Sequence, residues 1–385
     1  MDCWSHLESP EASPAAKRRP PPAARPTSTP SLLGRAACLR TLPRLQSYTH
    51  AHPVLEFVDA CLRGIGQTTF QNSPLTGLLF LVAFSLSTRG HRLVLFALIG
   101  VASGTSFSKL MGLDRSLRSA GLHGYNAALV GCAVHTFFHS DVFVGTAVVV
   151  IVGLSVVTVL LAAATAAALP PGLPTLTFPF QAAMWLYALG SQLYPRLQVM
   201  DLAPQRFVIN TTISAAPYDT TSVVHAIFAG IAETCLVSDW VSGVVMLLGI
   251  ALCSPIGSIA ALLASAAATL LAVAIDAPPA GVYLGLHGYN PVLIAMALSG
   301  FFLAPQHWRT AVVVVLGVGA TFLADCATGS LFTLLGLPVL TWPFTVMTWA
   351  CLLATEAMPD VTRVPLGDLT TPEEHYERQR CIDVV

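Results

Sequence analysis

Charged side chains are scarce in this sequence, and their scarcity restricts the functions it can have. Only 10% of the 385 residues are charged and the formal net charge is −1, whereas 54% are hydrophobic and the mean hydropathy is +0.69. A soluble domain carries about 25% charged residues, so we expect most of this chain to lie in a lipid bilayer. No basic face indicates nucleic acid as a partner.

The chain also lacks the residue clusters that metal binding or catalysis requires. Its nine cysteines are scattered without a Cys-x-x-Cys or Cys/His group, so neither a zinc site nor a disulfide framework is expected. An intramembrane enzyme would need a nucleophile beside a base, or a metal cluster, and neither HExxH nor GxSxG occurs. We therefore expect no enzymatic activity, no metal and no cofactor.

Polar segments flank the apolar region on both sides. Residues 1–50 are rich in proline and serine and contain the basic run Lys17-Arg18-Arg19. Because no apolar stretch followed by a small-residue cleavage site occurs there, we expect no secretory signal, and the composition predicts a disordered tail. Basic flanking residues favour the cytoplasm. Residues 358–385 are expected to form a second short cytoplasmic tail.

The apolar region contains three motifs that occur twice in the same order. They are GLHGYN at 121–126 and 285–290, LPxxTxPF at 173–180 and 337–344, and GIGQT or GIAET at 64–68 and 230–234. The copies are separated by 164 residues for the first two motifs and by 166 for the third. Three motifs in one order at nearly constant spacing indicate an internal duplication.

The apolar runs of this region are mostly too short to cross a bilayer. The runs 75–87, 93–106 and 182–193 are shorter than the roughly 20 residues of a full span, and glycine and proline interrupt the region. Such interruptions are typical of half-membrane helices around a solute path. The expected fold is an all-α membrane protein with re-entrant half-helices around a central pore.

The number of passes predicts how the two copies are oriented. We count about five apolar passes in each copy, which gives membrane repeats at residues 51–196 and 223–357. An odd number of passes inverts the second copy and creates a pseudo-two-fold axis in the membrane plane. The linker 197–222 is then extracellular, and it contains the sequon Asn210-Thr211-Thr212. Asn210 is a candidate glycosylation site that is usable only on that side.

The paired LPxxTxPF motifs, each with a GLxGYN motif upstream, resemble the urea transporter family. The resemblance covers about Pro53 to Thr355 and excludes both tails. It implies a channel-like facilitator for urea and urea analogues, built from two inverted halves of about five transmembrane helices each. It further implies a homotrimer with one pore per subunit. We place the chain in the plasma membrane as a multi-pass protein with both termini in the cytoplasm.

Urea is small, flat and neutral, with four N–H donors and one carbonyl acceptor. A selective path for it should be narrow, with acceptor oxygens in a row and apolar or aromatic walls. Gln67 offers an amide oxygen, Thr177 and Thr341 offer hydroxyls, and Phe70 offers one face of a slot. Unwound backbone near the Tyr-Asn pairs of the GLHGYN motifs can present carbonyls at the ends of half-helices.

The resemblance assigns a role to each candidate residue. Thr177 and Thr341 resemble the pair at the constricted centre of the pathway. Gln67 and Phe70 resemble a polar and aromatic pair at one mouth, and Glu233 and Leu236 hold the equivalent places in the second half. The remaining motif residues are expected to support the pore, the asparagines by tying the broken backbone together: His123, Tyr125, Asn126, His287, Tyr289 and Asn290.

Glu233 is the largest departure from the symmetry of the motifs, because its counterpart is Gln67. An ionised carboxylate at low dielectric is costly, so three interpretations stay open. Glu233 is held neutral by burial, is hydrated in a wide vestibule, or caps a helix N-terminus. The replacement of Phe70 by Leu236 in the second copy also weakens the symmetry of the aromatic slots.

An ion-coupled secondary transporter of a small neutral amide or a related solute is the alternative function. Such a protein usually carries carboxylates within its spans. The candidates are few, and only the first of them falls within a motif: Glu233, Asp239, Asp325 and Glu356.

Overall fold

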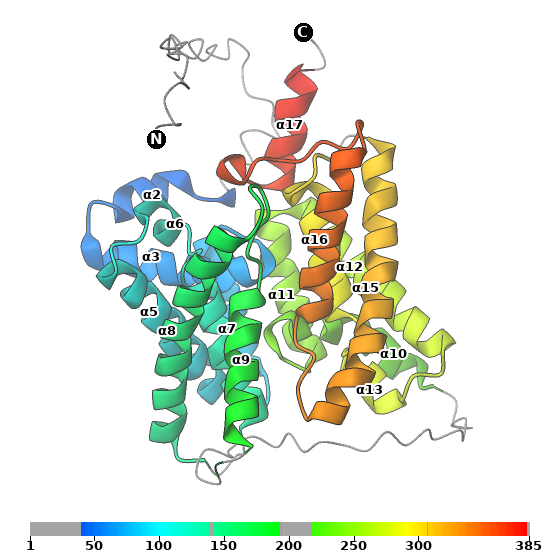
Figure 1. Ribbon diagram of the computed structural model, residues 1–385, viewed down its shortest axis with the longest axis horizontal. Helices are drawn as coiled ribbons and strands as arrows, with labels where there is room; N and C mark the ends of the chain where they lie inside the picture. Colours follow the sequence, from blue (N-terminus) through cyan, green and yellow to red (C-terminus); the bar gives the residue numbers. More distant parts are fainter. Residues whose placement is uncertain (1–39, 139–141, 193, 195–217, 306, 383–385) are drawn as a thin grey trace, which may run out of the picture.

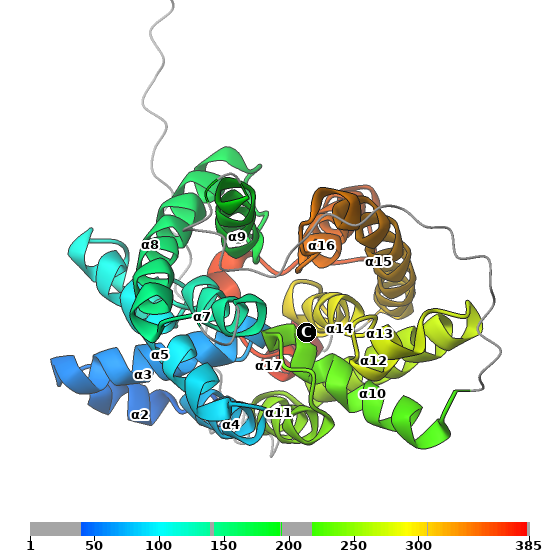
Figure 2. The same ribbon diagram turned by 90° about the horizontal axis from the view of Figure 1, so that it is seen from below.

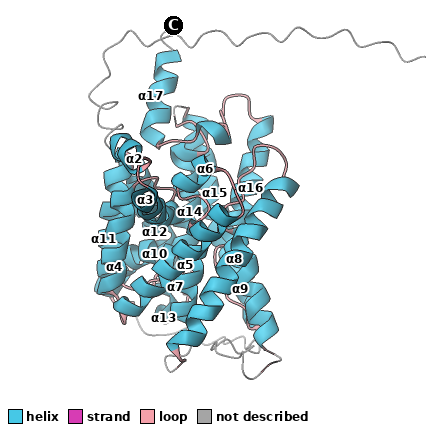
Figure 3. Cartoon of the chain, turned by 90° about the vertical axis from the view of Figure 1, so that its left-hand side faces the viewer, coloured by secondary structure: helices cyan, strands magenta, loops and turns pink. Residues whose placement is uncertain are grey.

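A computed structural model describes residues 40–138, 142–192, 194, 218–305 and 307–382 (Figure 1). Their regular structure is helical, and the described residues contain no strand beyond one isolated bridge (Figure 3). The first half contains α2 (Pro43–Thr49), α3 (Pro53–Gly66), η1 (Gln67–Thr69), α4 (Pro74–Leu86), α5 (Gly90–Leu110), α6 (Arg115–Ser119), α7 (Tyr125–Phe137), α8 (Val144–Ala168) and α9 (Phe178–Ser191).

The second half follows the same order of elements. It contains α10 (Thr220–Ala232), η2 (Glu233–Cys235), α11 (Trp240–Cys253), α12 (Pro255–Ala274), α13 (Pro279–Tyr283), α14 (Tyr289–Met296), the π-helical turn η3 (Ala297–Phe301), α15 (Trp308–Leu335) and α16 (Trp342–Ala354). The short turns η4 (Thr355–Ala357) and η5 (Leu366–Asp368) then lead to α17 (Pro372–Ile382), which projects from one end of the bundle (Figure 1).

Full-length and shorter apolar helices are mixed in this bundle. By length and composition α5, α8, α12 and α15 can cross a membrane, and a fifth span results if α10 and α11, bent by 69° at η2, are counted as one. Other apolar helices are shorter than a bilayer requires, such as α4 with 13 residues and α9 with 14. The chain is therefore an all-α, multi-pass membrane protein.

The outward faces of the long helices carry large apolar side chains. Val149 on α8 is 72% exposed, Leu263 on α12 is 64% exposed and Val315 on α15 is 69% exposed. Such faces would be costly in water but suit contact with lipid tails. The interior between the halves is filled instead by buried aromatic rings, including Phe80, Phe180 and Phe344.

Hydrogen bonds between the halves come in matched pairs where α4 packs on α11. The Thr76 hydroxyl donates to the Gly249 carbonyl at 2.8 Å, and the Ser242 hydroxyl donates to the Ala83 carbonyl at 2.8 Å. Ser242 is the repeat counterpart of Thr76, and Gly249 is the counterpart of Ala83. Reciprocal contacts of this kind arise when two similar bodies are related by a two-fold axis. Figure 2 shows the two groups of helices facing each other.

The helices α9 and α16 leave the middle of the bundle in opposite directions. In Figure 1 the first descends from the middle and the second rises from it. Their N-termini therefore meet near mid-height, between the two halves. Both begin directly after a threonine, Thr177 and Thr341, which are the N-cap residues.

The two segments expected to be tails differ from that expectation where they are described. Residues Pro43–Thr49 form α2, although they were placed in a disordered segment 1–50. Residues 361–375 are packed against the bundle, because backbone groups and buried side chains among them bond to the second half. Residues 1–39 and the linker residues 195–217, with Asn210, lie outside the described residues. The helix α10 already begins at Thr220.

Candidate functional site

The two threonines of the LPxxTxPF motifs lie in direct contact at the centre of the protein. The hydroxyl oxygens of Thr177 and Thr341 are 2.7 Å apart, and Thr345 lies 3.3 Å from Thr177. Thr177 and Thr341 are each 4% exposed. Because a hydroxyl both donates and accepts, this pair can exchange its mutual bond for bonds to a solute.

The rest of each motif explains why the chain is unwound here. Pro179 and Pro343 lie in the first turn of α9 and α16, where the missing N–H of proline costs nothing and its fixed φ favours helix initiation. Leu176 and Leu340, just before the threonines, have left-handed φ angles of 50° and 52°. Such a conformation costs a non-glycine residue about 1–3 kcal/mol, so the surroundings must hold it.

The GLHGYN motif of the first half provides that support. The Tyr125 hydroxyl donates to the Leu176 carbonyl, and the Asn126 amide donates to the same oxygen at 3.4 Å. The Asn126 side-chain oxygen accepts from the Phe180 N–H at 3.3 Å. Because α7 begins at Tyr125, the unwound carbonyl held here belongs to Leu176, rather than to the Tyr-Asn pair as expected.

The second half repeats these contacts. The Tyr289 hydroxyl donates to the Leu340 carbonyl at 2.8 Å, the Asn290 amide donates to the same oxygen at 3.1 Å, and its oxygen accepts from the Phe344 N–H at 3.3 Å. The side chains of both motifs thus clamp the left-handed residue and the first turn of the following helix. These side chains contact residues on either side of the threonine in the sequence, and not the threonine itself.

The glycine that opens each GLHGYN motif permits a close approach of backbones. Gly121 and Gly285 have φ angles of 80° and 79°. A Cβ atom on either would lie 2.3 Å from a backbone nitrogen, that of Gly64 or Gly230. The motif therefore requires glycine for both its conformation and its packing.

The histidines of the two GLHGYN motifs, His123 and His287, are half-buried. Among the described residues, His123 Nε2 and His287 Nδ1 are buried without a hydrogen-bond partner. The ring of His287 lies 6.2 Å from the Phe322 ring, centroid to centroid. These observations leave each ring one free polar atom but connect neither ring to the threonine pair.

Gln67 and Phe70 lie together at η1. Phe70 has a φ of 65° and its ring centroid lies 5.0 Å from Phe301, 5.8 Å from Phe302 and 6.0 Å from Phe344. The Gln67 amide donates to the Ala120 carbonyl at 3.0 Å. This bond occupies an N–H of the amide, so an acceptor role falls to its oxygen.

Glu233 and Leu236 occupy the matching places at η2. Leu236 has a φ of 59°, and its carbonyl accepts from the Thr136 hydroxyl at 3.1 Å. Glu233 is 8% exposed, and its carboxylate accepts a hydrogen bond from the hydroxyl of the exposed Ser238. Glu233 is the C-cap of α10 and the first residue of η2, whereas the N-cap of α11 is Asp239.

Three polar residues on the helices that begin at the threonine pair were missed in the sequence. Thr345 and Thr348 follow Thr341 at spacings of four and seven residues, which places all three on one face of α16. The Gln181 amide donates to the Val339 carbonyl at 3.1 Å. Within the described chain, the Gln181 oxygen and the Thr348 hydroxyl are buried without a partner. The helical spacing of the threonines was the signal that could have found two of them.

Two indole N–H groups bond to the LPxxTxPF motif of the opposite half. Trp185 donates to the Pro338 carbonyl and Trp349 donates to the Pro174 carbonyl, each at 2.8 Å. The two bonds are reciprocal between the repeats, like those between α4 and α11. The ring of Phe178 lies 5.8 Å from Trp349, so aromatic faces border the threonine pair.

Asp325 is a buried carboxylate that one half has and the other lacks. It lies on α15, is 8% exposed, and accepts from the Asn290 amide at 2.8 Å. Its repeat counterpart is Leu161. Asp325 therefore contacts the GLHGYN motif, a connection that its position in the sequence did not reveal.

A match to a family model now connects this geometry with known proteins. The family described as urea transporter matches residues 58–356. This chain belongs to the urea transporter family. The resemblance predicted from the paired motifs is confirmed, and membership places the chain among transporters rather than enzymes.

Curated urea transporters resemble the chain over most of its length. Urea transporter 1 of the goat, Capra hircus, is 28% identical over 323 residues, which are 83% of this chain and 83% of the relative. Urea transporter 1 of the mouse, Mus musculus, is 28% identical over 324 residues, which are 84% and 83% of the two chains. The urea transporter match includes both threonines and ends at Glu356, before η5 and α17.

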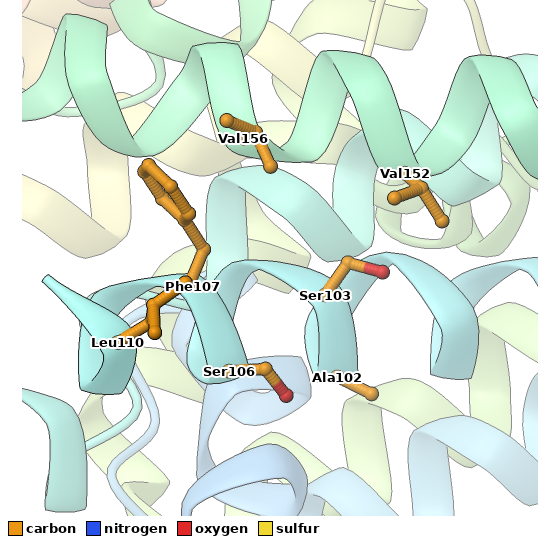
Figure 4. Close-up of a pocket in the computed structure, with 7 residues that line it drawn as sticks. All are labelled: Ala102, Ser103, Ser106, Phe107, Leu110, Val152 and Val156. Carbon is orange, nitrogen blue, oxygen red and sulfur yellow. The ribbon is translucent and has the colours of Figure 1, made fainter.

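An open groove elsewhere on this urea transporter shares no residue with the candidate site. It has a volume of about 480 Å³ and lies between α5 and α8. In Figure 4, Ser103 and Phe107 of α5 point toward α8, and Val152 and Val156 of α8 point toward α5. Its lining is apolar except for two serines: Ala102, Ser103, Ser106, Phe107, Leu110, Val152 and Val156. In the part of the chain that the structure describes, no three metal-ligating side chains gather into a site.

Proposed function

We propose that this chain carries urea passively across the membrane through a narrow, channel-like path between its two halves. The observation that carries the proposal is the buried contact of Thr177 with Thr341. The side-chain oxygen of Gln181, one turn along α9 from Thr177, is buried without a partner among the described residues. Family membership supports urea as the solute. Close analogues of urea are expected to use the same path less well.

The threonine pair is proposed as the central constriction. A solute that enters must replace the 2.7 Å bond between the hydroxyls of Thr177 and Thr341. Urea N–H groups can donate to both oxygens, and its carbonyl can accept a hydroxyl proton, so little hydrogen bonding is lost. Each bond left unmade in a buried site would cost about 1–3 kcal/mol. The free Gln181 oxygen offers a further acceptor for the remaining N–H groups.

The pairs at η1 and η2 are proposed as the two mouths. In each pair a polar side chain, Gln67 or Glu233, stands three residues before an apolar one, Phe70 or Leu236, with left-handed backbone. The polar oxygen can take an N–H of urea while the apolar side chain packs on its flat face. The supporting roles of His123, His287 and the Tyr-Asn pairs remain part of this proposal.

We propose that the halves are inverted repeats of about five spans each. The opposite directions of α9 and α16 and the reciprocal bonds between the halves support this arrangement. The proposed topology has repeats at 51–196 and 223–357, cytoplasmic termini and an extracellular linker with a glycan at Asn210. A homotrimer in the plasma membrane completes the proposal.

Ion coupling is disfavoured by the partners of the four candidate carboxylates. Glu233 bonds to Ser238 and Asp325 bonds to Asn290. Asp239 caps α11, and Glu356 pairs with Arg363 at 3.0 Å. Each therefore has a local structural partner.

The test is urea uptake into liposomes that contain the purified protein. We expect uptake well above that of empty liposomes, undiminished when ionophores abolish sodium and proton gradients, and reduced by thiourea as a competitor. Uptake equal to that of empty liposomes would refute the function. Uptake that requires a gradient would favour the ion-coupled alternative.

A further inference from the structure

The chain segment 361–378 is bonded to the turn that carries two rings of the slot around Phe70. The Val364 N–H donates to the Phe302 carbonyl and the Ala304 N–H donates to the Thr362 carbonyl, both at 2.9 Å. These bonds make the antiparallel bridge between Leu303 and Arg363. We call residues 361–378 the C-terminal clamp.

His375 fixes the clamp to η3 through a backbone carbonyl. It is 5% exposed, its Nδ1 lies 2.7 Å from the Gly300 carbonyl, and its Nε2 accepts from the Thr370 N–H at 3.0 Å. Nε2 also lies 3.3 Å from the Asp368 carbonyl. The tautomer with its proton on Nδ1 matches the shorter contacts, because it accepts from Thr370 and donates to Gly300. The imidazole is thus a two-ended link between the clamp and the turn.

Gly300 packs closely against Pro372 of the clamp. Its φ is 123°, which interrupts the π-helical turn, and a Cβ atom there would lie 2.6 Å from the Cβ of Pro372. Only glycine allows both this backbone conformation and this contact. The clamp therefore covers the turn at the residue directly before Phe301.

Glu373 anchors the clamp a second time, on α12. It is 5% exposed, and one carboxylate oxygen accepts from the Ser254 hydroxyl at 3.0 Å and from the Ile256 N–H at 2.8 Å. A carboxylate is favoured at this helix N-terminus. Arg40 lies 3.7 Å from its other oxygen. The clamp thus holds η3 relative to a long membrane helix.

Gly300 and its counterpart in the first half make different contacts. In the first half Thr136 is the counterpart of Gly300, and its hydroxyl bonds directly to the Leu236 carbonyl at 3.1 Å. Gly300 has no side chain with which to reach Phe70 in the same manner. Instead its carbonyl is held by His375, and the neighbouring Phe301 packs on Phe70.

We propose that the C-terminal clamp positions the aromatic slot of Phe70, Phe301 and Phe302 and so contributes to discrimination between urea and bulkier analogues. His375 and Glu373 are positioning residues that act through η3. The proposal rests on the proposed urea path, and it adds a segment beyond residue 356, where the family match ends. Thiourea, whose sulfur is larger than the oxygen of urea, is the probe of slot width.

The test compares His375→Ala and Glu373→Ala with the wild-type full chain in two measurements. Hydrogen exchange reports the amide of Ala304, and liposome uptake gives the ratio of thiourea flux to urea flux. We expect at least about tenfold faster exchange, equivalent to the loss of about 1.4 kcal/mol of local stability, and a flux ratio changed at least about twofold. His375→Asn, which keeps a donor near Gly300, should restore wild-type behaviour.

Glu374→Ala is the matched control, because Glu374 lies beside Glu373 on α17 and its carboxylate pairs with Arg378 of the same helix at 3.8 Å. It should change neither measurement. Unchanged exchange in both clamp variants, or faster exchange with an unchanged flux ratio, would overturn the proposal. A wild-type protein without urea flux would refute the proposed function, whereas the exchange data would still decide whether the clamp holds the turn. If one variant does not fold, the other carries the test.

Discussion

Thr177 and Thr341 are 164 residues apart in the chain, yet their hydroxyl oxygens lie 2.7 Å apart. Each is the N-cap of a helix that begins at the middle of the bundle, and neither hydroxyl caps its own helix. Because the hydroxyls bond to each other and not to the backbone of their own helices, both hydroxyls can bond to a solute instead. This relationship makes the pair the first target for mutation.

Replacing Thr177 by valine should reduce urea flux about tenfold, whereas Thr341→Val should have a smaller effect. Valine keeps the shape and removes the hydroxyl, so urea in the constriction loses one hydrogen-bond partner, at a cost of about 1.4 kcal/mol, which is tenfold. The Thr341→Val variant keeps the hydroxyls of Thr177 and Thr345, which are 3.3 Å apart. Stopped-flow light scattering of liposomes measures the flux. Thr333→Val is the control, because that hydroxyl is exposed and bonds within α15. Equal flux in all variants would remove the pair from the path.

The resemblance to the urea transporter family implied that Thr177 and Thr341 form a pair at the centre, and both copies of the motif carry the same residue at this position. A two-fold relation brings identical positions together, so identity between copies is visible in the sequence alone. Gln181 and Thr345 are also repeat counterparts, but they differ in chemistry and escaped notice. Sequence repetition finds the symmetric part of a site and misses the asymmetric part.

The sequence did not predict that the chain after residue 356 is folded, because this segment has no repeat counterpart. The clamp is polar and has no counterpart motif, and its structure depends on single contacts such as His375 with Gly300. Composition alone favours a loose tail in such a segment. Likewise α2 was assigned to the disordered tail because residues 43–49 adjoin a proline-rich stretch.

Glu233→Gln should leave urea flux within about twofold of wild type. The carboxylate accepts from Ser238 and offers an acceptor oxygen, and glutamine keeps such an oxygen, as Gln67 does in the first half. Uptake at neutral pH, with and without a sodium or proton gradient, measures the effect. Complete loss of flux would show that the charge is essential and would revive the ion-coupled alternative.

Asp325→Leu should lower both stability and flux, and Asp325→Asn should do so less. Leucine, the residue of the first half at this position, cannot accept from the Asn290 amide, whereas asparagine can present its side-chain oxygen. Leaving a buried amide N–H without one of its partners costs about 1–3 kcal/mol. Thermal unfolding in detergent gives the stability. A variant with leucine as stable and active as wild type would show that the Leu340 carbonyl alone suffices to hold Asn290.

Gly121→Ala and Gly285→Ala should prevent the protein from reaching a monodisperse folded state. In each case the new methyl group would lie 2.3 Å from a backbone nitrogen of the facing helix, and the φ near 80° is strained for alanine. Backbone on both sides leaves no flexible side chain to move away. Gly153→Ala is the control, because a methyl group there meets nothing within 4 Å on α8. Size-exclusion chromatography after extraction separates the outcomes: a normal profile for either variant would mean that the halves do not require this close approach, whereas an altered profile for the control would make the glycines' effect nonspecific.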